Sequence, residues 1–489
     1  MEQTVSRFRS LSEQFRQLTR QEILSRLSAL ATVDPSDRLL GSELTLLRRR
    51  IANKGRGASI RSMIDQMPTL LPRLCPVMLM SPLSVAQYIS MEGPQFDLVL
   101  FDEASQMPTS EAIGAIARGK SVVVVGDPKQ MPPTNFFSSL GTDDDVDTGD
   151  LESILDDCIA LSMPARYLRW HYRSRHESLI AFSNLHFYDH RLVTFPSPDE
   201  QEPHVMLRHV NGCYDAGASR TNRAEAEAVV EEAVSRMKTQ PDRSIGIVAF
   251  SKPQSDLIED LLNERFAAEP ELEEKDRLRE EPLFVKNLEN VQGDERDVIL
   301  FSVGYGPNKD GLLSMNFGPL NKAGGERRLN VAITRARYEM KVFASLMPND
   351  IDERRTKAEG VVALKRFLQF ADDGLVESLT PSAQNDGHDI IVSNIADALR
   401  REGLDVKTQV GTSALRMDIA IADPRHPEIF KLGIICDGCA LCRIKTVADR
   451  EVVMPTVLTH LGWHLIRLWT PDWFAHPDRV IQQIKDYMA

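Results

Sequence analysis

Two carboxylates stand directly after a short apolar run in the first quarter of the chain. Asp102 and Glu103 follow the run LVLF, which has the length and composition of a buried strand. Ligands of α/β sheets bind at the carboxyl ends of strands, so both side chains would project into such a site. Asp102 could then bind Mg²⁺ on a phosphate chain while Glu103 polarises an attacking water. Strand-end acids that only face solvent are the alternative interpretation.

A second set of polar residues follows the next apolar run. SVVVV ends in the sequence GDPKQ, which contains Gly126, Asp127 and Gln130. Glycine and aspartate at this point favour a tight turn at the same edge of the sheet. A carboxamide there can hydrogen-bond a γ-phosphate, so we interpret Gln130 as a sensor of that phosphate. Gly126 and Asp127 would then lie beside the nucleotide.

The elements that must position these residues follow an α/β pattern. Strand-length apolar runs alternate with helical stretches, which predicts parallel sheets covered by helices. The runs are PVMLM, FDLVLFD, SVVVVGD, SIGIVAF (244–250), DVILFSVG (297–304) and KVFASL (341–346), followed near the end by MDIAIA, KLGIIC and WHLIRLW. We expect a helical segment at 1–75, a partial first lobe at 76–141, a second lobe at 151–346, a helical linker at 347–387 and a third domain at 388–489.

Five motifs, in order, resemble those of superfamily 1 helicases. They are FDEASQ, VVGDPKQMPPT, LRWHYRS (168–174), ENVQGDERDVI (289–299) and LNVAITRAR (329–337). The similarity is to Upf1-like and large bacterial helicases in which an endonuclease-like domain follows the motor. This resemblance implies an α/β fold with two RecA-like P-loop NTPase lobes. It also implies ATP and Mg²⁺ as cofactors and single-stranded nucleic acid, DNA rather than RNA, as a partner.

The resemblance also implies roles for individual residues. Asp102 would bind Mg²⁺, Glu103 would activate water, and Gln130 would couple the γ-phosphate to movement. Arg173 in HYRS and Arg335 in AITRAR would reach the γ-phosphate from the second lobe. Arginine suits this role because its planar, permanently charged fork stabilises a transferring phosphoryl group. A surface ion pair is the ordinary role of a single arginine.

The resemblance also implies that the QGDE string of the fourth motif supports the nucleotide through Gly293 and Glu295. A motor of this kind also needs a strand, then G-x-x-x-x-G-K-[ST], then a helix, because backbone amides and a lysine must hold the phosphates. Residues 1–95 contain no such string. It matches once, from Gly114 to Ser121 through Lys120, but there a helical stretch precedes the loop and an apolar run follows it. We interpret this match as coincidence.

The first lobe is therefore expected to be incomplete. A longer gene product, a separate chain that supplies the phosphate loop, and loss of nucleotide turnover all stay open. The alternative to an ATP-driven motor is a catalytically inactive subunit or remnant that binds nucleic acid or a partner.

Residues 388–475 resemble a restriction-endonuclease-like domain of the very-short-patch-repair type, through RMDIAIADP, LGIICDG and LGWHLIRLWTPDWF. Such nucleases hold Mg²⁺ with two or three carboxylates on adjacent strands. The resemblance places Asp418 and Asp437 in those positions as a nuclease-like remnant. We expect a retained fold that binds DNA or partners, with active cleavage as the alternative.

The nuclease pattern is incomplete at three positions. Ile435 stands where relatives carry glutamate, no glutamate occurs near Val392, and Cys442 stands where a histidine is expected. Isoleucine cannot bind a metal ion. Cys436, Cys439 and Cys442 form a C-x-x-C-x-x-C run, which could bind zinc or an iron-sulfur cluster. A structural role is favoured, because Cys436 lies in an apolar strand and no fourth cysteine follows.

The composition and net charge limit the type of protein and the nucleic-acid contacts that it can make. The 489 residues include 42% hydrophobic and 26% charged side chains, which is typical of several globular domains. The net charge of −13 repels polyanions on average, so nucleic-acid contacts must be local. Arg48, Arg49, Arg50, Lys54, Arg56 and Arg61 form one basic cluster, which could contact phosphates or simply form a solvated helix face.

The sequence has no uncharged apolar run long enough to cross a bilayer, and its polar N-terminus lacks the apolar core of a signal peptide. Six cysteines are too few for a disulfide scaffold in a chain of this length. We therefore expect a cytoplasmic protein with no membrane partner.

Overall fold

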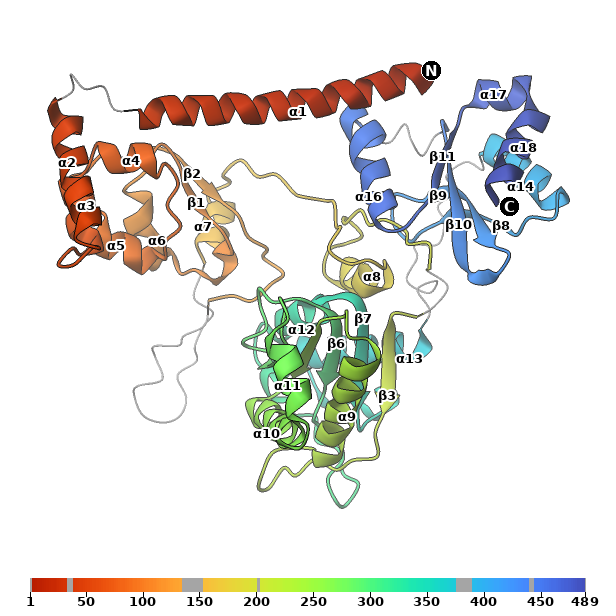
Figure 1. Ribbon diagram of the computed structural model, residues 1–489. Helices are drawn as coiled ribbons and strands as arrows, with labels where there is room; N and C mark the ends of the chain where they lie inside the picture. The colour runs from red at the N-terminus through yellow and green to blue at the C-terminus, as the bar shows by residue number, and fades with distance from the viewer. Residues whose placement is uncertain are drawn as a thin grey trace. The chain divides into compact units, whose positions relative to one another are not determined.

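The computed structural model describes residues 2–32, 38–133, 153–199, 203–374, 389–438 and 444–488. The chain divides into two units (Figure 1), one formed by Met1–Pro128 with Pro132–Arg166 and the other by Lys129–Met131 with Tyr167–Ala489. Within the described ranges, no helix combines the length and apolar character that a membrane span requires.

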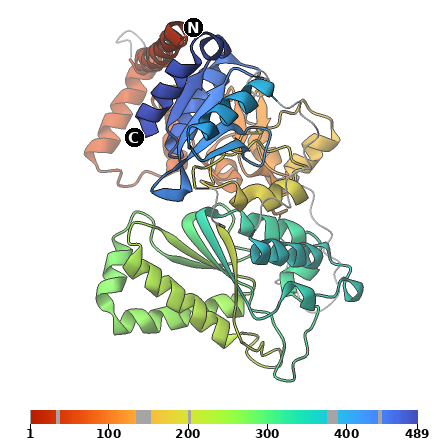
Figure 2. The same cartoon turned by 90° about the vertical axis from the view of Figure 1, so that its right-hand side faces the viewer.

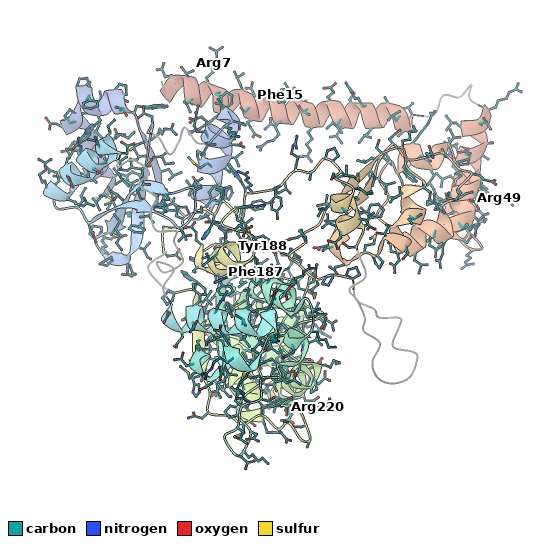
Figure 3. The ribbon with its side chains drawn as sticks, turned by 180° about the vertical axis from the view of Figure 1, so that it is seen from behind. Arg7, Phe15, Arg49, Phe187, Tyr188 and Arg220 are labelled. Atoms are coloured by element: carbon teal, nitrogen blue, oxygen red, sulfur yellow. The ribbon has the colours of Figure 1, made fainter. Side chains whose placement is uncertain are left out.

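The first unit begins with the helices expected for residues 1–75. They are α1 (Glu2–Ala31), α2 (Arg38–Ala52), α3 (Ile60–Gln66) and α4 (Leu70–Leu74), followed by α5 (Pro82–Tyr88). Glu43 of α2 is buried and accepts hydrogen bonds from the backbone N–H groups of Thr69 and Leu70. A carboxylate at a helix N-terminus is favourable, so this contact fixes α2 against α4. Arg7 and Phe15 lie on α1, and Arg49 lies in the last turn of α2 (Figure 3).

A small sheet follows these helices. Its elements are β1 (Val99–Phe101), η1 (Ala104–Gln106), α6 (Thr109–Ile116), β2 (Val122–Val124) and α7 (Ile154–Ala160). The two strands are parallel, with Val99 opposite Val122 and Phe101 opposite Val124. Phe101 packs with Ala104, Ala112 and Ile154 in a buried core. Ile154 belongs to this core, so α7 packs with the first unit.

The second unit contains a five-stranded parallel sheet in the order β3-β7-β6-β4-β5. Its strands are β3 (Val205–His209), β4 (Ile245–Ala249), β5 (Phe284–Asn287), β6 (Arg296–Ser302) and β7 (Ala336–Ala344). The helices are α8 (Ser178–His186), α9 (Arg223–Thr239), α10 (Lys252–Ala268), α11 (Pro270–Arg277), α12 (Gly325–Ile333) and α13 (Glu359–Asp373), with short turns η3 (Gly318–Asn321), η4 (Pro348–Asp350) and η5 (Glu353–Arg355).

Helices cover both faces of this sheet (Figure 2), as expected for parallel strands. Val298 and Leu300 of β6 pack on the face covered by α9 and α10, while Ile299 and Phe301 pack against α8, α12 and α13. Within the expected helical linker (347–387), the structure has α13, and Leu364 and Phe367 place this helix in the core of the lobe. The second lobe has the predicted α/β architecture.

The third domain has a four-stranded mixed sheet in the order β11-β10-β9-β8. Its elements are α14 (Ile390–Arg401), β8 (Val406–Val410), β9 (Met417–Asp423), β10 (His426–Cys436), the π-helix η7 (Asp449–Val453), α16 (Met454–His460), β11 (Leu465–Leu468), α17 (Thr470–Ala475) and α18 (Pro477–Met488). Cys436 packs on the face covered by α14 and α18, whereas its neighbour Ile435 packs on the face covered by α16.

Residues 167–199, which we call the joining segment, contact both parts of the second unit. The N–H of Arg175 donates to the carbonyl of Arg337 at 2.7 Å, which attaches the segment to β7. Trp463 donates its indole N–H to the carbonyl of Pro196, also at 2.7 Å. Buried Glu177 accepts the N–H of Thr412 at 2.8 Å, and burial raises the pKa of this carboxyl group. The segment therefore connects the second lobe to the third domain.

Candidate nucleotide site and nuclease-like site

Asp102 and Glu103 occupy the carboxyl end of β1, where the sequence predicted them. Both side chains are exposed, and the Glu103 N–H donates to Asp102 Oδ1 at 3.0 Å. Glu103 has a φ of +52°, a left-handed conformation that is uncommon for a residue other than glycine. Such conformations cost about 1–3 kcal/mol and cluster at functional sites. The Ala104 N–H donates to the Val125 carbonyl at 2.9 Å, which fixes this turn against the end of β2.

Gly126 allows the ends of the two strands to meet. A Cβ at this position would lie 3.0 Å from the backbone nitrogen of Ser105 and 3.1 Å from that of Ala104, closer than packed atoms normally approach. The turn that begins at Gly126 therefore lies against the turn that follows Asp102. The structure brings Asp102, Glu103 and Gly126, with Asp127 next along the chain, to one edge of the sheet, where exposed carboxylate oxygens could hold Mg²⁺.

The G-x-x-x-x-G-K-S string has no phosphate-binding geometry. It runs from α6 into β2, so a helix precedes the loop and a strand follows it. The N–H groups of Gly119 and Lys120 donate to the carbonyls of Ile116 and Phe96, both at 3.0 Å. Lys120 Nζ pairs with exposed Asp97 at 2.9 Å. The amides that would cradle phosphates are engaged in backbone bonds, so the string is a coincidence, as predicted.

Gln130 lies in the second unit. Its Oε1 accepts a 3.4 Å hydrogen bond from Gln292 Nε2, which belongs to the QGDE motif. The preceding carbonyl of Lys129 accepts from Asn330 Nδ2 at 2.9 Å, and Met131 is buried in the core of the lobe. The structure thus places Gln130 beside two of the five motifs, while Asp102 and Glu103 belong to the other unit.

Arg173 and Glu295 form an ion pair, with 2.7 Å between Arg173 Nε and Glu295 Oε2. Glu295 also lies 3.4 Å from Arg337 Nη1. Arg337 bonds Glu281, and this hydrogen bond is the main cause that raises the pKa of the guanidinium. Gly293 has a φ of +86°, which only glycine adopts readily, so it makes the turn that presents Glu295.

Arg335 is buried and donates to the carbonyl of Val331 at 2.6 Å and to Thr334 Oγ1 at 2.9 Å. Its charge also reaches His171, which precedes Arg173 by two residues. Burial, and then the charges of Arg173 and Arg335, lower the pKa of His171 to about 4. Both predicted arginines therefore act electrostatically on the same imidazole, that of His171.

The two predicted nuclease-like carboxylates lie on adjacent strands and differ in environment. Asp418 of β9 is 6% exposed, accepts the Cys436 N–H at 2.8 Å, and has its pKa raised to about 6, chiefly by burial. Asp437 follows β10 and accepts the N–H of Thr470 at 2.9 Å. This bond fixes the first residue of α17, so Asp437 has a structural role in addition to any metal ligation.

A third carboxylate, Asp389, was not identified from the sequence. It precedes α14, and its Oδ1 accepts the N–H of Ile391 at 3.1 Å as a helix cap. Burial is the main cause that raises the pKa of both Asp418 and Cys436, and the charge of Asp389 adds to each shift. In the sequence, the sign of this helix cap was an aspartate directly before an amphipathic helical stretch. The other two cysteines of the C-x-x-C-x-x-C run lie outside the described residues.

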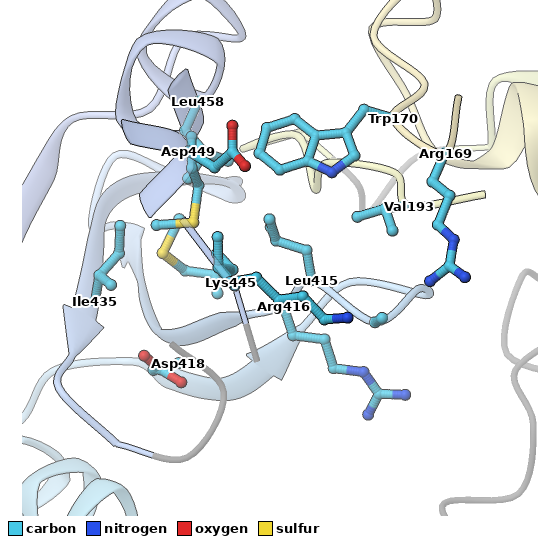
Figure 4. Close-up of a pocket in the computed structure, with 14 residues that line it drawn as sticks. Arg169, Trp170, Val193, Leu415, Arg416, Asp418, Ile435, Lys445, Asp449 and Leu458 are labelled. Carbon is cyan, nitrogen blue, oxygen red and sulfur yellow. The ribbon is translucent and has the colours of Figure 1, made fainter. Parts of the chain in front are cut away.

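A cavity of about 470 Å³ opens beside Asp418 (Figure 4). Arg169 and Trp170 of the joining segment line it together with Arg416, Asp418, Ile435 and Lys445. Ile435 thus lines the same cavity as Asp418. The basic side chains could contact a phosphate near Asp418.

Comparisons with known proteins match separate parts of this chain to different family models. Two family models, both described as AAA domain, match residues 78–138 and 151–346, and a REase-like family model matches residues 392–488. An uncharacterized ATP-dependent helicase of Mycoplasma genitalium is 29% identical over 457 residues, and its Mycoplasma pneumoniae homologue is 28% identical over 449. Each alignment covers 86% of this chain and 39% of the relative.

A 5′-3′ DNA helicase of Mus musculus is 26% identical over 263 residues, which is 52% of this chain and 13% of that protein. The chain thus spans 39% of the length of the two mycoplasma relatives. It carries AAA-type helicase domains of the Upf1-like superfamily 1 type, followed by a REase-like domain.

Proposed function

We propose that this chain is part of a cytoplasmic, ATP-dependent superfamily 1 motor that acts on single-stranded nucleic acid, DNA rather than RNA. One observation carries the proposal. Exposed Asp102 and Glu103 stand at the sheet edge of one unit, while Arg173, Glu295 and Arg335 gather in the other. A motor that closes two lobes around ATP requires acidic residues on one lobe and arginines on the other.

The residues fit Mg²⁺–ATP chemistry. Asp102 would hold Mg²⁺, which neutralises charge on the phosphates, and Glu103 would orient the attacking water. Arg173 and Arg335 would stabilise the charge on the transferred phosphoryl group, and Gln130 would report the γ-phosphate to the QGDE turn. Because Arg173 is held by Glu295, its guanidinium is already oriented before nucleotide binds.

The phosphate loop would come from polypeptide that completes the first lobe. The β1–β2 sheet has two strands, and one face carries exposed Leu100 and Val123. Parallel sheets are normally covered on both faces, and two strands alone are marginal. Leu79, 94% exposed, extends the apolar surface before β1. A strand-loop-helix segment bearing G-x-x-x-x-G-K-[ST], in the same gene product or a separate chain, would cover it.

The test is reconstitution. The chain is co-expressed with such a segment, and ATP turnover is measured with and without single-stranded DNA or RNA. We expect DNA-stimulated turnover, and we expect Glu103→Gln to abolish it. Glu111→Gln, the same change at an exposed position on α6, should leave the turnover unchanged. Equal turnover in wild type and Glu103→Gln would contradict the proposal.

The alternative is a subunit that binds nucleic acid or a partner without turnover. The environment of Arg335 favours it, because this guanidinium donates to the Val331 carbonyl of the preceding helix, α12. Binding of DNA by the reconstituted protein without any ATP turnover would support this alternative. The nuclease-like domain is proposed to bind DNA without cleaving it in either case, because Ile435 removes a metal ligand.

A further inference from the structure

Three potential metal ligands meet where the joining segment approaches the second lobe. His176 lies two residues before α8, Asp199 ends the joining segment, and His204 directly precedes β3. Both α8 and β3 belong to the second unit and are labelled in Figure 1. None of the five helicase motifs or the nuclease-like residues includes Asp199 or His204, so these two are unexplained by the proposed function.

The geometry of this His176–Asp199–His204 cluster is compact. One ligand atom from each side chain lies within 4.8 Å of the other two. His176 Nδ1 is 3.3 Å from Asp199 Oδ1, and the two imidazole rings stack with centroids 3.2 Å apart and planes inclined by 14°. Two nitrogens and one carboxylate oxygen from three different points of the chain therefore lie close together, and the nearly parallel rings must rotate to direct both nitrogens at one ion.

His176 is the least explained member of the cluster. Its side chain is 5% exposed, and Nδ1, although 3.3 Å from the Asp199 carboxylate, makes no aligned hydrogen bond with any described residue. A buried polar atom left unsatisfied costs about 1–3 kcal/mol, so it normally has a function or a missing partner.

We propose that His176, Asp199 and His204 bind a zinc ion, with solvent in the fourth position. Two imidazoles and one carboxylate suit Zn²⁺, whereas Mg²⁺ and Ca²⁺ prefer oxygen ligands alone. Zinc would satisfy the buried Nδ1 of His176. It would also attach the end of the joining segment to the start of β3.

Positive charge nearby limits the affinity. Arg243 lies over the Tyr338 ring at 3.5 Å and Arg175 at 5.6 Å, and the charges of both arginines act on His176. The negative charge of Asp199 opposes them. We therefore expect a site of moderate affinity that holds one ion, and Asp199 is essential to it.

The experiment measures zinc binding by the full chain without a polyhistidine tag, in competition with a chromophoric chelator. The starting protein carries Cys439→Ser and Cys442→Ser, which removes the other candidate zinc site. His204→Gln should lower zinc affinity at least about tenfold, because losing a ligand exceeds the effect of losing a second-shell partner. His426→Gln is the matched control, since exposed His426 also lies 3.2 Å from a carboxylate, Glu428, but has no third ligand.

Equal zinc affinity in this starting protein and in its His204→Gln variant, or no zinc binding by the starting protein, would overturn the proposal. Asp199→Asn is the second variant, because its half-exposed side chain can be changed with little effect on folding. Cobalt substitution gives an independent readout. The cobalt-loaded wild type should lack an intense thiolate charge-transfer band, and a band that disappears with the two cysteine changes would assign the metal to cysteine instead.

Discussion

Asp418→Asn should stabilise the third domain at neutral and alkaline pH. Asp418 is 6% exposed, and burial is the main cause that raises its pKa from 3.8 to about 6. Asparagine keeps an oxygen that can accept the Cys436 N–H, which donates to the carboxylate at 2.8 Å. The side chain of Gln409, now a donor to Asp418, can rotate to accept from the new amide. The substitution therefore removes a buried charge and retains its main hydrogen bond.

The magnitude follows from the pKa. A rise from 3.8 to about 6 corresponds to about 3 kcal/mol of unfavourable free energy for the ionised form. The folded state binds more protons than the unfolded state between these two values, so the stability of the wild type falls as pH rises through this window. The stability gained by Asp418→Asn should grow from under about 1 kcal/mol at pH 4 to about 3 kcal/mol at pH 8.

Urea unfolding at both pH values, in EDTA and followed by tryptophan fluorescence, measures this gain. Three of the four tryptophans, Trp463, Trp469 and Trp473, lie in the third domain. Asp423→Asn, at the end of the same strand, is the control and should show no such pH-dependent gain. A less stable Asp418→Asn protein at pH 8 would refute the reasoning. Selective stabilisation of the wild type by Mg²⁺ would show that the metal site survives.

Three further predictions concern the two sites. Lys120→Ala should leave nucleotide binding by the reconstituted motor unchanged in a fluorescent-nucleotide titration, because Lys120 only pairs with exposed Asp97; a large loss would mean that the string binds phosphate after all. Arg173→Ala and Arg335→Ala should each lower its turnover by roughly 10³–10⁵, and wild-type rates would remove them from the mechanism. Arg335→Ala should also lower the melting temperature, since Arg335 is buried and hydrogen-bonded, whereas Arg173 is half-exposed and its ion pair is worth at most about 1 kcal/mol. Ile435→Glu should be less stable than the wild type without metal and should gain more melting temperature from Mg²⁺; plasmid cleavage by the wild type that Asp418→Asn stops would contradict the degenerate-nuclease interpretation.

The parts of the site predicted from the sequence were those fixed by local rules. A strand of apolar residues that ends in Asp102 and Glu103 needs no distant partner to place its acids at a sheet edge. The same local order, helix before loop and strand after it, excluded Lys120 as a phosphate-binding residue. The sequence could also show that position 435 lacks a metal ligand. Isoleucine cannot bind a metal ion, wherever its side chain lies.

Other features depend on contacts between distant segments. Gln130 belongs to the second unit because Asn330 binds the preceding carbonyl, 201 residues away along the chain. Asp389 approaches Asp418 only after α14 packs on the sheet. His176 and His204 are separated by 28 positions and include no recognisable metal-binding spacing. Periodicity and spacing carry no information on such pairings, so these groups emerged only from the structure.

The joining segment makes one continuous path between the two candidate sites. Trp170 lines the cavity beside Asp418, and Arg173, three positions later, pairs with Glu295 of the nucleotide motif. After Arg173, the segment is fixed by two hydrogen bonds, one from the Arg175 N–H to the Arg337 carbonyl and one from the Thr412 N–H to buried Glu177. These bonds limit how far its backbone can move. A shift of Arg173 toward a bound phosphate must therefore be absorbed near Trp170, in the wall of the nuclease-like cavity. We therefore expect nucleotide binding by the proposed motor to change the shape of that cavity through this short stretch of backbone.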